Sequence, residues 1–489
     1  MKDTIYLIKI NTTEEFKELC KEHLGAPVLT ADLETSGFDF MVDKIGCITL
    51  GFNKYEGFYT PWALVDKVAL NELFASAKFI LGANFKFDVR FLWWNGIPSA
   101  RIDGDTVQLG HVLNEQRRNG LKTHAFIYSP FGGYDRDLDR YREKTGVENY
   151  LLIPEHIMIP YATMDVIVVQ WVYEAEQLQL TEVDKKYPNE KNPSWSMRRY
   201  YEDIMMPAVN AFAKIEYRGV YINKEALAQS RKEILEEIEE IEAFLRETWN
   251  LTTDFDFNSP KVLGTLFENL GFEDFGRAKS GVFLTSDGQL ERWAQSGHPE
   301  IKKLQKLRSL KTVLKSFISY EEGGEKGWEQ YLRWHEEDKS WRMHPTFNVM
   351  RTDTGRCKSD SPNMQNVPAH GELAEKVKRC ITAPDPEKYE LCTVDYSSLQ
   401  IRLATIDTNI NESGRDEFLY SIYTDPKLGG DMHSRTGHFI FCEGKEFDIE
   451  MIEVTDERGV VKTFFSGEKV KTKRGYVKAS LLRAEDVLI

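Results

Sequence analysis

The sequence is poor in the features that mark several large protein classes. Only six of its 489 residues are cysteines and no two form a C-x-x-C pair, which argues against a zinc ribbon and a disulfide framework. No stretch of about 18 apolar residues occurs, so no membrane span is expected. The N-terminus lacks the apolar core of a secretion signal. These absences predict a cytoplasmic protein.

The chain also lacks an excess of positive charge. It carries 63 lysines and arginines against 78 aspartates and glutamates, a net charge of −15. Phosphate binding draws on Lys and Arg, so this balance alone argues against a general nucleic-acid binder. The argument has limited reach, because metal-binding carboxylates add negative charge and a basic patch can lie on an acidic protein. A hydrophobic content of 41% is ample for packed cores, and the length suggests about three domains.

The sequence pattern changes along the chain without repeats or low-complexity tracts. Up to about residue 180, apolar runs such as 27–33 and 45–52 alternate with helical stretches, which predicts an α/β domain. A polar stretch at 185–194 with two prolines is the best linker. Residues 195–335 are mainly helical, and an α/β pattern returns from Trp341.

Two amphipathic helices are predicted within the helical region. The apolar face of the first consists of Leu227, Ile234, Ile238, Ile241 and Leu245. The second runs from Ile301 to about Tyr320, and its other face is basic, with Lys302, Lys303, Lys306, Arg308, Lys311 and Lys315. Two interpretations of this basic face stay open: a solvated helix surface, or a cationic rail along a nucleic-acid backbone.

Acidic residues form the first group with chemical meaning. Asp32 and Glu34 stand two apart at the end of a predicted strand, so their side chains share one face. Two carboxylates aimed together repel each other unless a cation lies between them. Asp88 follows another short apolar run, and Tyr161 and Asp165 are four apart on one helical face. Oxygen ligands of this kind suit Mg²⁺ or Mn²⁺.

In order and spacing, these groups resemble the three exonuclease motifs of the DEDD superfamily in its Tyr-bearing subclass, across roughly residues 1–185. That subclass is the proofreading domain of family A DNA polymerases. The resemblance implies a ribonuclease H-like α/β domain with 3′→5′ exonuclease activity. It also implies two metal ions about 4 Å apart, held by Asp32, Glu34, Asp88 and Asp165.

The same resemblance assigns roles to three further residues. Tyr161 would orient the attacking water toward the terminal phosphate, and Asn84 would help to position the DNA strand. Asp105 matches another recurring acidic position, and we expect it to be structural.

A second group of motifs begins at residue 351. The turn-rich stretch 351–368 contains amide and guanidinium side chains, which suit the minor-groove acceptors that every base pair presents; an ordinary polar loop is the alternative. Farther on, the apolar run 391–394 predicts a strand that ends at Asp395 before a helix begins. A strand-end aspartate is a good metal-ligand position, and it could equally cap the helix.

Together these segments resemble the T-G-R, P-N-x-Q-N-x-P and A motifs of family A polymerases, and the resemblance runs from about residue 1 to 441. It is closer to the compact polymerases of bacteriophages, and the localisation would then be the host cytoplasm. It implies that Asp395 is a catalytic metal ligand and that His433 reaches the triphosphate of the nucleotide. Gln400 replaces the glutamate that usually blocks a ribose 2′-OH. The implied primer-template contacts are Arg356, Asn363 and Gln365.

Two polymerase motifs are absent after residue 441: the helix that closes over the nucleotide, and the His-Asp-Glu motif with the second metal-ligating aspartate. Residues 442–489 show β-like runs instead, which an insertion, a divergent tail or part of an intein-type β fold could provide. The expected domains are 1–190 (exonuclease), 191–335 (helical thumb), 336–441 (first part of an α+β palm) and 442–489 (a β-rich tail).

The sequence therefore predicts a replication enzyme that acts on single-stranded DNA 3′ ends and on primer-template DNA with dNTPs. Its polymerase site would be incomplete and completed by a second polypeptide carrying the C-terminal half. A processivity factor is a further possible partner. Two alternatives stay open: a non-catalytic polymerase remnant that only binds DNA, and an RNA-degrading nuclease of the same superfamily.

Overall fold

The computed structural model describes residues 4–189, 193–318, 327–349, 352, 354–396, 398–410 and four short strands between 451 and 478. The chain divides into two compact units, Met1–Leu391 and Cys392–Ile489. No helix in the described ranges is long and apolar enough to cross a membrane.

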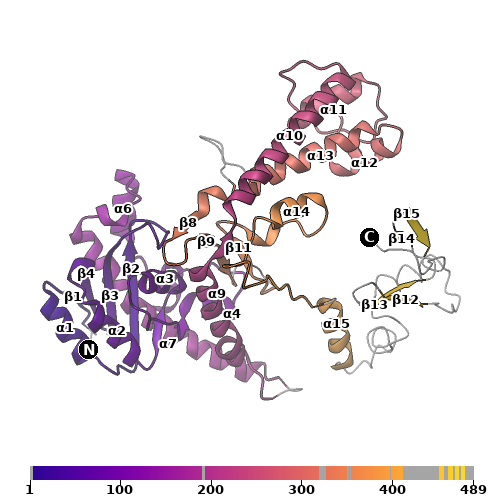
Figure 1. Ribbon diagram of the computed structural model, residues 1–489. Helices are drawn as coiled ribbons and strands as arrows, with labels where there is room; N and C mark the ends of the chain where they lie inside the picture. The colour runs from indigo at the N-terminus through magenta and orange to yellow at the C-terminus, as the bar shows by residue number, and fades with distance from the viewer. Residues whose placement is uncertain are drawn as a thin grey trace. The chain divides into compact units, whose positions relative to one another are not determined.

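A six-stranded mixed sheet forms the centre of the N-terminal region (Figure 1). Its strand order is β1-β4-β3-β2-β5-β6. The strand β3 runs antiparallel to both of its neighbours, and the other pairs are parallel. The strands are β1 (Tyr6–Lys9), β2 (Leu29–Thr35), β3 (Ile45–Asn53), β4 (Glu56–Pro61), β5 (Ile80–Gly82) and β6 (Gly104–Asp105). The predicted strands at 27–33 and 45–52 are confirmed as β2 and β3.

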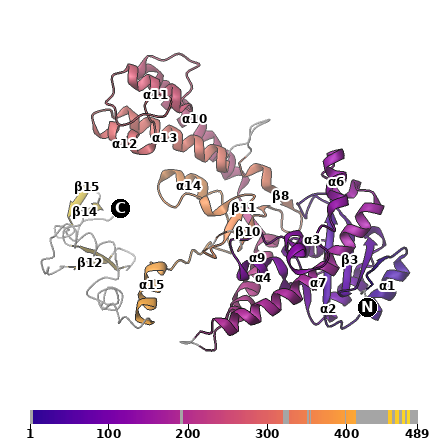
Figure 2. The same cartoon turned by 180° about the vertical axis from the view of Figure 1, so that it is seen from behind.

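Helices pack around this sheet (Figure 2). Local sequence accounts for several of their starts, because Thr12, Asp66 and Asp105 accept hydrogen bonds from the first turns of α1, α2 and α4. The helices are α1 (Thr13–Glu22), α2 (Lys67–Ser76), α3 (Lys86–Trp94), α4 (Thr106–Leu113), α5 (Leu121–Tyr128), α6 (Arg136–Thr145) and α7 (Glu155–Lys186). The longest, α7, crosses β1 to β5 and ends within the predicted linker.

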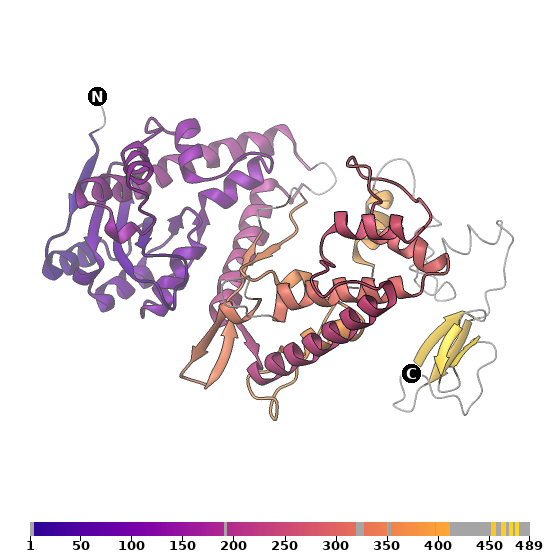
Figure 3. The same ribbon diagram turned by 90° about the horizontal axis from the view of Figure 1, so that it is seen from above.

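The predicted thumb consists of helices with a second apolar core. Its long helix α10 (Lys224–Trp249) lies beside α13 (Glu300–Val313), as Figure 3 shows. Both apolar faces predicted from the sequence are buried between them. The second helix was expected to reach about Tyr320, but α-helical geometry ends at Val313 and a π-type turn continues over Leu314–Ile318. The helices α11 (Pro260–Asn269) and α12 (Asp287–Gln295) complete this core. The helices α8 (Met197–Arg199) and α9 (Met206–Arg218) precede it, and the buried apolar side chains of α9 belong to the core of the N-terminal sheet.

Short strands lie before and after the long helices α10 and α13. The strands β7 (Val220–Ile222), β9 (Ser340–Met343) and β8 (Leu332–His335) form one antiparallel sheet, with β9 in the middle. A separate antiparallel pair joins β10 (Thr346–Asn348) to β11 (Lys358–Asp360), and the helix α14 (Glu372–Lys378) packs against α10 and α13. The return of an α/β pattern near Trp341 is therefore confirmed.

The second unit holds one helix and two hairpins among its described residues. The helix α15 spans Leu399–Ile410. The hairpins pair β12 (Met451–Thr455) with β13 (Val461–Phe465), and β14 (Lys469–Thr472) with β15 (Gly475–Lys478). These four strands coincide with β-like runs in the sequence of the tail, whose β-rich fold as a whole stays a prediction.

One predicted strand is wrong. The run 391–394 was expected to form a strand that ends at Asp395, but residues 391–396 have no strand geometry. Its apolar side chains stay exposed, with Val394 at 86% and Tyr396 at 75%. Strand geometry requires a neighbour for the backbone N–H and C=O groups, and none of the described strands pairs with this run.

Candidate functional site: a buried carboxylate cluster

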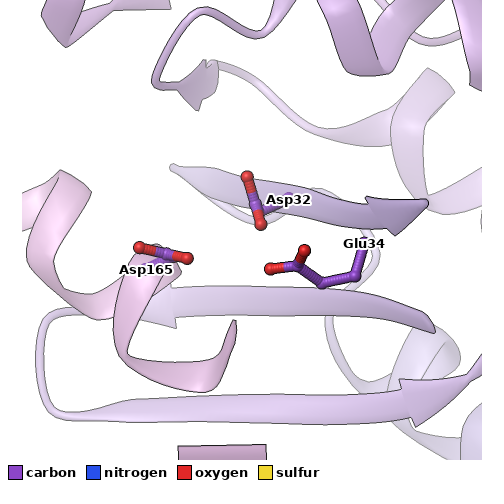
Figure 4. Close-up of side chains that lie close together, drawn as sticks. All are labelled: Asp32, Glu34 and Asp165. Atoms are coloured by element: carbon purple, nitrogen blue, oxygen red, sulfur yellow. The ribbon is translucent and has the colours of Figure 1, made fainter. Parts of the chain in front are cut away.

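The predicted carboxylate pair lies on the central strand β2. Asp32 is opposite Thr49, and Glu34 is opposite Cys47 on β3. Because side chains two apart on a strand share a face, both carboxylates project toward α7. Asp165 projects from that helix toward them (Figure 4). One oxygen from each of Asp32, Glu34 and Asp165 lies within 4.8 Å of the others.

The fourth predicted carboxylate, Asp88, adjoins this group without belonging to the close set of three. It lies in the first turn of α3 and is 4% exposed. Its Oδ1 accepts a hydrogen bond of 3.1 Å from the backbone N–H of Leu33, between the two acidic residues of β2. Its charge raises the pKa of both of those residues. The structure therefore brings all four predicted carboxylates to one place.

Burial and mutual repulsion act together on these acids. Burial is the largest cause that raises the pKa of Asp32 and Glu34 well above the ordinary range, and the neighbouring carboxylates raise it further. Burial raises the pKa of Asp165 to about 7. Four acids that oppose each other's ionisation form a site that a divalent cation stabilises, and all-oxygen donors fit Mg²⁺ or Mn²⁺.

Two tyrosines hold Asp165 from the cavity side. The Tyr134 hydroxyl donates a hydrogen bond to Oδ1 of Asp165. Tyr161, one helical turn before Asp165 on α7, also hydrogen-bonds that carboxyl. The two rings are stacked, with centroids 6.1 Å apart. Tyr161 was predicted from its spacing to Asp165, whereas Tyr134 lies in a turn without a recognisable motif.

The carboxylates open into a cavity of about 1080 Å³ that also contains positive charge. Lys122 from α5 and Arg142 from α6 line it. The Lys122 ammonium lies 4.9 Å from the centroid of the Tyr161 ring and lowers the pKa of Asp32, Glu34 and Asp165. Neither cation was predicted from the sequence, because isolated basic residues on polar helices have no distinguishing spacing.

The residues predicted beside the cluster differ in their surroundings. Asn84 precedes α3 with a left-handed φ of 58° and lines a neighbouring cavity of about 500 Å³. Asp105 is fully buried and caps α4, and it also accepts a hydrogen bond of 2.8 Å from the backbone N–H of Phe85. Burial raises its pKa to about 6. These contacts agree with the structural role expected for Asp105.

A second buried acid lies farther along α7. Glu176 is fully buried, and its Oε1 lies 2.9 Å from Nδ1 of His124 on α5. Burial raises the pKa of Glu176 to about 9 and lowers the pKa of His124 to about 4. Burial therefore disfavours the charged form of both side chains.

The predicted primer-template residues lie in the first unit, Arg356 in a loop and Asn363 and Gln365 at a short 3-10 helix, Met364–Asn366. Arg356 is exposed. Asn363 accepts a hydrogen bond of 3.0 Å from the backbone N–H of Gln365. The Gln365 side chain accepts from Ser359 N–H at 2.7 Å and donates to the Cys357 carbonyl at 2.9 Å. The Gln365 amide thus helps to hold the loop in shape.

Of the polymerase residues predicted in the second unit, the structure describes Asp395 and Gln400. Asp395 is exposed in the segment without strand geometry, and Gln400 is exposed in the first turn of α15. His433 lies outside the described residues.

The basic face of α13 differs from a continuous cationic rail. Lys306 is paired with Glu237 and Glu372, and Lys311 with Glu242 at 2.7 Å. These lysines connect α13 to α10 and α14, so they serve the thumb's own packing. Lys302 and Lys303, earlier on the helix, are exposed.

Comparison with known proteins adds family information to this geometry. The family described as "3'-5' exonuclease" matches residues 7–180, and "DNA polymerase family A" matches residues 224–465, past the palm boundary predicted at 441. DNA polymerase I of Borreliella burgdorferi is 25% identical over 464 residues, covering 91% of this chain and 45% of that protein. The DNA polymerase of Escherichia phage T5 is 24% identical, covering 88% of this chain and 51% of that protein.

The chain thus spans about half the length of the curated relatives it matches. A solved structure of the POL domain of Pol1 from M. smegmatis, in complex with a DNA primer-template and dNTP, is similar in fold. Its TM-score is 0.58 at 17% identity, with 76% of this chain and 58% of that chain covered. Two family matches, and similarity to DNA polymerases over 91% and 88% of this chain, agree with the cluster on β2 and α7: the chain belongs to family A of the DNA polymerases and contains the family's 3′–5′ exonuclease domain.

Proposed function

We propose that this chain removes nucleotides from the 3′ ends of single-stranded DNA in a reaction that depends on two divalent metal ions. The carrying observation is the convergence of Asp32, Glu34 and Asp165 within 4.8 Å, with Asp88 beside them. Their mutual repulsion in a buried place supports a role as metal ligands. The open cavity above them offers room for a nucleotide.

The residues of the cavity divide the chemical work. Bound Mg²⁺ or Mn²⁺ supplies an acidified water near neutral pH and stabilises charge on the leaving 3′ oxygen. Tyr161 orients the attacking water, and Lys122 and Arg142 attract the phosphate into the cavity. Asn84, at the start of α3, positions the strand.

The test is release of the terminal nucleotide from a 3′-labelled single-stranded oligonucleotide in Mg²⁺. The double variant Asp32→Ala, Glu34→Ala is expected to lose nearly all activity. The matched control Glu18→Ala, Glu22→Ala removes two charges from the exposed side of α1 and should keep it. Tyr161→Phe should be slower than wild type, because it removes the hydroxyl that orients the attacking water. Equal rates for wild type and the Asp32/Glu34 variant would refute the site.

We further propose that the second half of the chain takes part in template-directed DNA synthesis with dNTPs. Arg356, Asn363 and Gln365 would contact the primer-template, and Asp395 would hold a metal ion. Gln400 and His433 would contact the incoming nucleotide. The family A match over residues 224–465 supports these roles.

Nucleotidyl transfer with two metal ions needs a second carboxylate. In family A that carboxylate belongs to the His-Asp-Glu motif, which does not occur in these 489 residues. Residues 1–489 alone should therefore not extend a primer, and the missing motifs would stand in a second polypeptide or further along a longer chain. The assay is primer extension with all four nucleotides in an Asp32→Ala background. Robust extension would contradict this proposal, whereas duplex binding without extension agrees with it.

A further inference from the structure

A cluster of buried charged side chains connects α3, the helix that contains Asp88, to α9. Lys86 and Arg90 stand two residues before and two after Asp88, and their side chains are 6% and 8% exposed. Both are paired with Glu216 on α9, whose side chain is fully buried. The Lys86 ammonium contacts Oε1 of Glu216, and Nη1 of Arg90 lies 3.0 Å from Oε2.

The same carboxylate also holds a strand that leads toward the predicted primer-template loop. The backbone N–H of Phe347, on β10, donates to Oε1 of Glu216 at 2.6 Å. The Lys86 ammonium donates to the Phe347 carbonyl at 2.5 Å. In addition, the Glu216 carbonyl accepts from Nδ1 of His344 at 2.8 Å. One residue therefore connects α3, α9 and β10.

We infer that Glu216, which lies beyond the residues 7–180 that match the exonuclease family, is a positioning residue for the exonuclease reaction. Asp88 reaches β2 through its hydrogen bond to Leu33 N–H, and that contact depends on where the first turn of α3 lies. Glu216 holds this turn from its opposite side through Lys86 and Arg90. The inference rests on the exonuclease activity proposed above.

The physical reason is the cost of unpaired buried charge. Two cations can stay buried beside each other only with an anion between them, and removing one partner of a buried ion pair is far more disruptive than removing an exposed pair. Without Glu216, the Lys86 and Arg90 side chains must move toward water. Both are attached to the helical turn that contains Asp88, so the carboxylate moves with them.

The alternative is that Glu216 only stabilises the folded protein. A purely structural residue would lower the melting temperature and leave the folded enzyme's turnover and metal affinity unchanged. A positioning residue changes turnover and metal affinity in protein that is still folded. The two roles are therefore separable by measurement below the melting temperature.

The main variant is Glu216→Gln in the full chain, which keeps an oxygen acceptor for Phe347 N–H and removes the charge. We expect kcat on a short single-stranded oligonucleotide to fall about 10-fold with KM changed less than about 2-fold, as for lost support of a metal ligand. Mn²⁺ affinity, measured by calorimetry without DNA, should weaken. Hydrogen exchange should rise at the start of α3.

The matched control is Glu202→Gln, which removes an exposed carboxylate paired with Arg198 and should change none of these readouts. If Glu216→Gln does not fold, Arg90→Met tests the same link, because it leaves the Lys86–Glu216 pair in place and should give a smaller loss in the same direction. Folded variants with wild-type kcat and Mn²⁺ affinity would overturn the inference. An inactive wild type would instead overturn the proposed exonuclease function, and a loss of Mn²⁺ affinity in Glu216→Gln would still support the positioning role.

Discussion

Three acidic residues of the exonuclease motifs are buried in packed secondary structure, whereas Asp395 of the polymerase motif is exposed. Glu34, Asp88 and Asp165 are 7%, 4% and 5% exposed and lie on packed strands and helices. Asp395 is exposed in an irregular segment, next to Val394 at 86% exposure. Both regions match family A models, and among the residues that the structure describes the acids of the first assemble into a close group.

This difference in burial bears on which physical property identifies a metal site. An exposed aspartate is stabilised by water and needs no partner. Buried acids that raise one another's pKa need a cation or protons to remain there. Mutual destabilisation of charge in the absence of metal is therefore an informative property of the cluster around Asp32.

The largest expected contrast comes from the acids themselves. Asp165→Asn should reduce exonuclease turnover by about 10³-fold, because bound metal contributes several kcal/mol of transition-state stabilisation. Asp395→Asn should leave that rate within about 2-fold of wild type. Initial rates on a 3′-labelled oligonucleotide measure both. Similar losses in the two variants would remove the contrast between the regions.

A smaller effect is expected from the contact that the sequence analysis missed. Tyr134→Phe removes the hydroxyl that donates to Asp165. Loss of a group that orients a metal ligand lowers metal affinity or activity by about 10-fold or more, so the Mg²⁺ concentration for half-maximal rate should rise. Tyr128→Phe, whose hydroxyl bonds Gln179 on the surface side of α7, is the control. An unchanged Mg²⁺ titration in Tyr134→Phe would refute this role.

Burial of Glu176 should also make the thermal stability of the chain depend on pH. The pKa of Glu176 is raised from 4.5 to about 9 in the folded chain. A raised folded pKa gives a stabilising contribution that is complete at acid pH and is lost as pH rises from 4.5 toward 9. Glu176→Gln mimics the protonated acid, so its Tm should exceed the wild-type Tm by about 3 °C near pH 8.5 and by less than about 1 °C near pH 5.

The control for this effect is Glu174→Gln on the same helix, which removes an exposed carboxylate paired with Lys54. Its Tm should follow the wild-type Tm at every pH. Thermal unfolding measured between about pH 5 and about pH 8.5 tests this prediction. Parallel curves of Tm against pH for Glu176→Gln and wild type would show that the buried carboxyl does not titrate as described.

The smallest effect concerns the thumb. Changing Lys302 and Lys303 to Gln should weaken duplex DNA binding and reduce the salt slope by about 2, about 1 for each lost phosphate contact. Changing Lys306 and Lys311 to Gln should lower stability instead, because these lysines pair with glutamates. Binding titrations at several salt concentrations distinguish the two pairs of lysines. If the salt dependence of affinity has the same slope in wild type and both variants, the basic face of α13 is a solvated surface.

Local sequence was sufficient for much of the scaffold and for the core of the site. Strand periodicity predicted that Asp32 and Glu34 share a face, and helical periodicity did the same for Tyr161 and Asp165. The apolar faces of α10 and α13 followed from the same rule. These features depend only on neighbours within a few residues, so the order of residues along the chain specifies them.

Where a partner far along the chain decides the outcome, the predictions were wrong or absent. The run 391–394 has the composition of a strand, but strand geometry requires another strand beside it. The basic face of α13 was predicted without knowledge of Glu237 and Glu242, which take two of its lysines. Periodicity describes one element and not its neighbour.

The sequence by itself thus determined which acids this chain has and on which faces of which elements they lie. Only the tertiary structure decided that Tyr134 holds Asp165 and that Glu216 holds the helix of Asp88. Such contacts join residues separated by long stretches of chain, and nothing in local spacing encodes them. They form because a buried charge or polar group must find a partner wherever folding places one.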